Sequence, residues 1–114
     1  MGRKPYSEIR ENIIRILFVI GKGDGYLISK IYERVFPHVT MRSVYYHLNK
    51  GLELGTFNVE EVAEEQGSFS WGSVARKVYY SLSPARVVQL DPALREKIQK
   101  AHLAIKESQQ RSLY

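Results

Sequence analysis

The sequence TMRSVYYHLNKGLELG, residues 40–55, decides the fold. Thr40 can begin a helix, because its hydroxyl can accept a hydrogen bond from an N–H of the first turn. Gly55 is the residue type that most often follows a helix end. Between them, apolar residues recur at helical spacing. We therefore predict a helix over residues 40–54, and the side chains expected to face a core are Met41, Val44, Tyr45, Leu48 and Leu52.

The other side of this predicted helix carries polar groups: Arg42, Ser43, Tyr46 and Lys50, with His47 and Asn49 at its margins and Glu53, the one acidic residue, at its far end. Cations, hydroxyls and an imidazole are the groups that proteins use on phosphates and base edges. An amphipathic helix of any function also has a solvated polar side. The helix alone therefore leaves open whether this side binds a partner or only faces water.

The elements predicted before and after this helix favour a polar side that binds a partner over one that only faces water. Two helices are predicted before residue 40: one begins at Ser7, and one covers residues 26–36 and ends before Pro37. The glycine-rich residues 21–25 between them are predicted to be a plain turn. After Gly55 the pattern favours two strands of an antiparallel hairpin, and the second strand carries Arg76 and Lys77. Three helices followed by a hairpin is the order of a winged helix-turn-helix, in which the third helix reads DNA and the hairpin is the wing.

A fourth helix is predicted after Asp91-Pro92, to about residue 108. It carries an apolar seam at Leu94, Ile98, Ala101 and Ile105. The first helix likewise carries a second apolar stripe, at Ile14 and Phe18, besides the one expected to face the core. A helix that is apolar on two sides must be covered on both. The cover is either a distant segment of the chain or another copy.

Composition limits the function classes. At 114 residues the chain has the length of a single domain. It has no cysteine, and its three histidines are widely spaced, so we expect neither an enzyme nor a metal or other cofactor. No apolar run approaches the ~20 residues of a membrane span, and we expect a cytoplasmic protein. The net charge of +5 favours an acidic partner such as nucleic acid.

Three motifs resemble those of PadR-type winged-helix transcriptional regulators. They are GYLI at residues 25–28, SVYYHL at residues 43–48 with Leu52 and Gly55 following, and RKVYYSLS at residues 76–83. The resemblance covers residues 9–83 and implies a homodimeric transcription regulator, usually a repressor. It implies DNA contacts by Arg42, Ser43, Tyr46 and Lys50, and a C-terminal helix that packs on the first helix of the partner subunit.

The expected fold is therefore mainly α with a small antiparallel β hairpin: a winged helix-turn-helix over residues 1–84 and a dimerisation helix within residues 85–114. The expected DNA-binding set is Arg42, Ser43, Tyr46, His47, Lys50, Arg76 and Lys77. The expected dimerisation set is Ile14, Phe18, Leu94, Ile98, Ala101 and Ile105. The sequence does not indicate whether a small-molecule effector exists.

Two alternatives stay open at this point. The predicted first strand of the hairpin carries four carboxylates, Glu60, Glu61, Glu64 and Glu65, which phosphates would repel. A winged-helix module that binds another protein through this strand is one alternative, and a winged helix that binds RNA is the other. The place of Trp71, between the two strands, is also left open.

Overall fold

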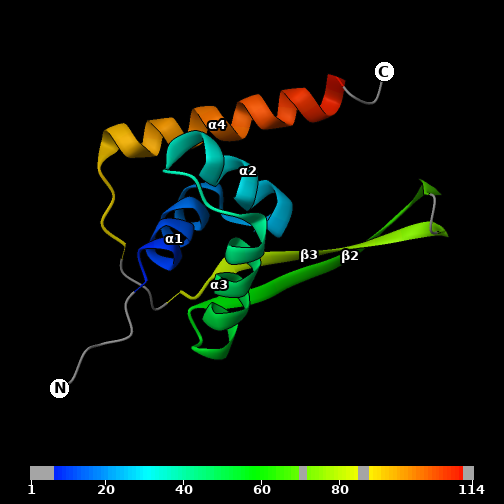
Figure 1. The fold of residues 1–114 in the computed structure, drawn as a ribbon, viewed down its shortest axis with the longest axis horizontal. Helices are drawn as coiled ribbons and strands as arrows, with labels where there is room; N and C mark the ends of the chain where they lie inside the picture. The colour runs from blue at the N-terminus through cyan, green and yellow to red at the C-terminus, as the bar shows by residue number, and fades with distance from the viewer. Residues whose placement is uncertain (1–6, 70–71, 85–87, 112–114) are drawn as a thin grey trace.

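The computed structural model describes residues 7–69, 72–84 and 88–111. Within these residues the chain is mainly helical, with a small antiparallel sheet (Figure 1). The elements in chain order are α1 (Glu8–Ile20), β1 (Lys22–Asp24), α2 (Gly25–Val35), α3 (Met41–Glu53), β2 (Phe57–Phe69), β3 (Gly72–Leu82) and α4 (Pro92–Arg111).

The first three helices begin where side chains cap them. Ser7 Oγ accepts the Arg10 N–H at 3.2 Å, and Asp24 Oδ1 accepts the Leu27 N–H at 3.0 Å. Thr40 Oγ1 accepts the Ser43 N–H at 3.1 Å, as predicted for the start of α3. Each cap satisfies an N–H that the helix itself leaves unpaired.

The sheet differs from the predicted hairpin by one strand. Its order is β1-β3-β2, so β3 pairs on both edges, and both pairings are antiparallel. Residues 21–25 were expected to form only a turn, and this was wrong: Lys22 pairs with Ser81, and Asp24 pairs with Tyr79. A strand of three residues is too short to show a period of two, and its existence depends on β3, more than 50 residues later in the chain.

The core lies among the helices and the root of the hairpin. Ile13, Ile16, Ile28, Val44 and Leu48 have no exposed surface. Phe57, the first residue of β2, is also buried, and its ring lies against the backbone of Gly51 in α3. This contact fixes the point where the hairpin leaves the helices. The hairpin then projects well beyond them (Figure 1).

α4 lies across α2 and α1 of its own chain (Figure 1). Its predicted seam is buried there: Ile98, Ala101 and Ile105 are at most 6% exposed, and Leu94 is half-buried. Ile14 of α1 is buried within the chain as well. A single chain thus already covers the four seam positions and Ile14. They therefore do not form an open dimerisation surface.

Phe18 is the exception in the predicted dimerisation set, with 42% of its surface exposed. Among the described residues, no helix is long and apolar enough to cross a membrane.

Candidate nucleic-acid interface

α3 has one buried side and one open side. Val44, Leu48 and Gly51 are buried, and they mark the centre of the side that faces the core. The prediction had centred this side nearer to Met41 and Tyr45, which are 41% and 39% exposed. The helix is therefore rotated from the predicted orientation, because the small Gly51 lets Phe57 pack against it while Met41 lies at the edge.

The open side carries exposed polar residues that point away from the core: Arg42, Tyr46, Asn49 and Lys50, with Glu53 at its C-terminal end. Tyr46 is 61% exposed, which is unusually open for an aromatic side chain. Arg42 forms no ion pair with any described residue. The prediction had left Asn49 at the margin of this side. Recognising Gly51 as a core position would have placed Asn49 on this side.

Lys50 is available despite an ion pair. Its ammonium lies 3.4 Å from a carboxylate oxygen of Glu53, and both side chains are largely solvent-exposed. Exposed pairs of this kind contribute about 0–1 kcal/mol, so a phosphate can replace the carboxylate at low cost. Glu53 also lies at the far end of α3, away from Arg42.

His47 does not belong to the open side. It is half-buried, and its Nδ1 lies 3.4 Å from Ser7 Oγ at the start of α1. Burial lowers the pKa of His47, and the nearby guanidinium of Arg10 lowers this pKa further. A neutral imidazole in the contact between α1 and α3 is a poor ligand for phosphate. Of the predicted DNA contacts, His47 is thus placed in helix packing, and Ser43 is half-buried beside the cap.

Tyr45 packs α3 against neighbouring elements. Its ring covers Gly25, the first residue of α2, and a side chain at Gly25 would overlap this ring. Burial raises the pKa of the Tyr45 phenol, and the Asp24 carboxylate raises this pKa further. Tyr80 of β3 lines the same small cavity as Tyr45, and burial likewise raises the pKa of Tyr80. Tyr45 therefore joins α2, α3 and β3 at one place.

Two of the carboxylates at the root of the hairpin have polar partners. Glu60 accepts a hydrogen bond from the Ser81 hydroxyl at 2.9 Å, and Glu61 pairs with Lys22 of β1 at 3.2 Å. Lys77 is half-buried on β3 and lines the cavity beside Tyr45. Arg76 stands opposite Glu64 in the strand register, and its side chain lies outside the described part of the structure, as do the side chains of Glu64, Glu65 and Trp71.

Groups of side chains that could bind a metal ion were sought among the described residues. No three histidine, aspartate or glutamate side chains gather there in a way that could hold an ion. Comparison with known proteins adds nothing to these geometric findings: no protein-family model matches the chain, and a search of curated proteins finds no match.

Proposed function

We propose that this protein is a transcription regulator that binds double-stranded DNA sequence-specifically, as a winged helix-turn-helix of the PadR-like type. The observation that carries the proposal is the open side of α3, where Arg42, Tyr46, Asn49 and Lys50 are exposed together. The opposite side of the same helix is fully used in the core. An α-helix presented in this way has the width that a major groove admits.

The four side chains have the chemistry for both kinds of DNA contact. A guanidinium such as that of Arg42 can donate two hydrogen bonds to guanine O6 and N7. An amide such as that of Asn49 can pair with adenine N6 and N7. The Lys50 ammonium suits a phosphate, since it is a point charge on a flexible stem. We therefore assign base reading to Arg42 and Asn49, and backbone contact to Tyr46 and Lys50.

The β2–β3 hairpin takes the role of the wing in this proposal. It leaves the helices beside α3, because Phe57 at its root packs against Gly51 of that helix. Arg76 and Lys77 of β3 are the proposed contacts to the DNA backbone. Repression is the regulatory role that the family resemblance implies.

We further propose that the protein acts as a homodimer on an inverted repeat, with the two α3 helices about 34 Å apart. The α4 seam is buried within each chain. Phe18, which is 42% exposed, is therefore the predicted dimerisation residue that remains for a contact between copies.

The test is selection of bound duplexes from a random pool, followed by affinity measurements at two salt concentrations. Arg42→Ala should weaken binding to the selected duplex by about 1–3 kcal/mol and relax the preference at one position. Lys50→Ala should weaken selected and scrambled duplexes alike and lower the salt slope by about 1. Arg34→Ala is the matched control, because it removes the same type of exposed cation from the end of α2.

Parental affinity in both α3 variants would contradict the proposal. Binding to structured RNA in preference to duplex DNA would favour the RNA-binding alternative. No binding of duplex DNA, or weak binding whose affinity does not change with salt, would favour a protein partner.

A further inference from the structure

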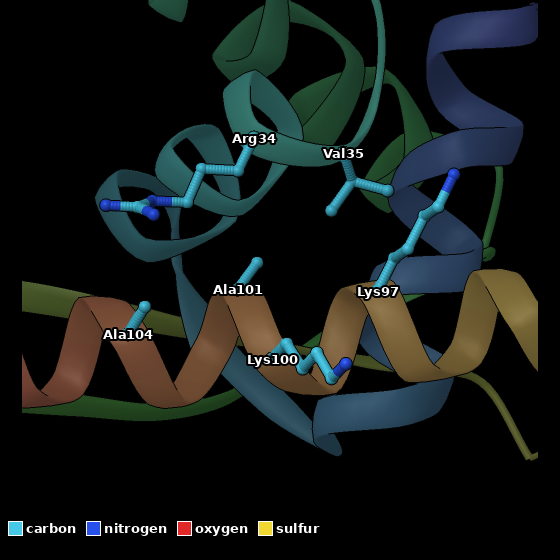
Figure 2. A pocket seen from close by; sticks show the side chains of 6 residues that line it. All are labelled: Arg34, Val35, Lys97, Lys100, Ala101 and Ala104. Carbon is cyan, nitrogen blue, oxygen red and sulfur yellow. The ribbon is translucent and has the colours of Figure 1, made fainter.

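An open hollow lies between α2 and α4. It has a volume of about 470 Å³, and the described residues that line it come from these two helices alone (Figure 2). None of them belongs to α3, so the hollow and the open side of α3 share no residue.

The floor and one wall of the hollow are apolar. Ala101 and Ala104 of α4 form the floor, and Val35 of α2 forms the wall. Ala101 is 6% exposed, whereas Val35 and Ala104 are half-buried. The alanines have no side-chain atoms beyond Cβ, so the space above them can take an apolar side chain from outside. Removing that side chain from water would favour binding.

The rim of the hollow is cationic. Arg34 of α2 and Lys97 and Lys100 of α4 are exposed, and none of the described lining residues is acidic. Arg34 and Lys97 form no ion pair with any described residue. Lys100 pairs with Glu96 at 3.1 Å, but both side chains are largely exposed, so this pair is weak. The rim therefore favours a partner that carries negative charge.

The directions of the three cations distinguish between kinds of acidic partner. Figure 2 shows the charged ends of Arg34, Lys97 and Lys100 pointing in different directions around the hollow. Their charges do not converge on one small anion, whereas a chain that carries several carboxylates can pair with each in turn. A polypeptide also has apolar side chains that can fill the space above the alanines, which the sugar–phosphate backbone of a nucleic acid lacks. The hollow thus fits an acidic polypeptide best.

We propose that the hollow between α2 and α4 is a docking site for an acidic segment of a partner protein. An apolar side chain of this segment enters the hollow above Ala101 and Ala104, and flanking carboxylates pair with Arg34, Lys97 and Lys100. The proposal goes beyond DNA binding and does not depend on it.

The experiment measures the binding of labelled peptides to the whole chain by fluorescence anisotropy. The probe is a peptide of leucine and glutamate. One comparison peptide has glutamine in place of every glutamate, and the other has serine in place of every leucine. The probe should bind about tenfold more tightly than either, because only the probe uses both the cations and the apolar floor. No binding of the probe, or equal binding of either comparison peptide, would overturn the proposal.

Charge variants locate the bound peptide. Arg34→Gln combined with Lys97→Gln should weaken binding of the probe about tenfold, since two of its ionic partners are lost. The matched control combines Lys30→Gln with Lys106→Gln, which removes one cation from each of the same two helices outside the hollow. Equal losses in the two double variants would mean that the peptide responds only to net charge, which contradicts the proposal.

A variant that fills the hollow tests the apolar contact without changing the charge. Ala104→Phe should weaken binding of the probe by at least about tenfold, because the ring occupies the space that the leucine needs. Circular dichroism checks the fold, and Ala104→Leu takes its place with the same expectation if the fold is lost. Parental affinity in the folded variant would overturn the proposal.

Two further measurements distinguish the proposed partner from other occupants. A single-stranded oligonucleotide should not displace the probe from the hollow. Displacement that the Arg34→Gln, Lys97→Gln double variant abolishes would assign the hollow to nucleic acid. Sedimentation should give the parent and this double variant the same oligomeric state, and a difference would assign the hollow to a contact between copies. Either result would overturn the proposal.

Discussion

α3 and α4 are both amphipathic helices, yet their amphipathic patterns differ in what they reveal. In α3 the apolar spacing predicts the buried residues Val44 and Leu48, and the polar side is exposed. In α4 the spacing also predicts the buried residues Ile98 and Ile105. The expected cover was a second copy, whereas these residues pack on α2 and α1 of the same chain. The period of a helix thus shows which side is buried. It does not show whether the cover comes from the same molecule or from another.

The largest expected effect tests the cover of α4. Ile98→Ala should lower the free energy of unfolding by about 2–5 kcal/mol, because Ile98 has no exposed surface and the substitution leaves a cavity. The measurement is urea unfolding at two protein concentrations, and the loss should be the same at both. Leu103→Ala on the same helix is the control, because Leu103 is 61% exposed and should cost less than about 0.5 kcal/mol.

A loss of stability that shrinks as the protein concentration rises would mean that a second copy covers the α4 seam. In that case α4 would be buried by contact with a second copy, whereas α3 would be buried within its own chain.

The next effect tests the buried side of α3. Gly51→Ala should destabilise the protein by about 1–3 kcal/mol, because the added methyl overlaps the ring of Phe57. Helix propensity alone predicts the opposite sign, a gain of about 0.8–1 kcal/mol. Thermal unfolding decides between the two signs. Introducing Gly51→Ala into a Phe57→Leu background should reduce its cost, since the ring that it overlaps is then absent; a stabilised single variant would contradict the close contact.

The smallest effect compares the histidines of the two helices. Burial lowers the pKa of His47 in α3 and of His102 in α4, so the unfolded chain binds more protons than the folded chain in mild acid. The free energy of unfolding should therefore fall as the pH drops through about 6.5, the unfolded value, and on toward the lower folded values. Denaturation between pH 8 and pH 5.5 should show a smaller fall in His47→Gln and in His102→Gln than in the parent. An unchanged fall in both variants would contradict burial of these imidazoles.

Local sequence signals predicted the helices and the longer strands well. Ser7, Thr40 and Gly55 lie at or next to helix ends, as expected, because caps and left-handed glycines act within a few residues. The change of period after Gly55 predicted β2 and β3, because side chains alternate along a strand whatever its partner. Arg42, Tyr46 and Lys50 of the candidate interface were found in the same way.

The remaining features depend on contacts between distant residues. β1 is a strand because β3 pairs with it, and no residue pattern within Lys22–Asp24 predicts a strand. His47 is turned toward Ser7, forty residues earlier in the chain, which an analysis of α3 alone does not show. The orientation of α3 depends on Phe57 packing at Gly51, and this contact moved Asn49 into the open side.

The pairing of β3 on both edges has a mechanical consequence. β2 and β3 are 13 and 11 residues long, but β1 and the helices contact only the start of β2 and the end of β3. At ~3.3 Å per residue, a free arm of about eight residues is ~26 Å long. A rotation of ~10° about the anchored end would carry the far end through ~4–5 Å, from the same strand geometry. The three residues of β1 lie at the anchored end of the hairpin, so a small rotation of Lys22–Asp24 would displace the far part of β2 and β3 by several ångströms.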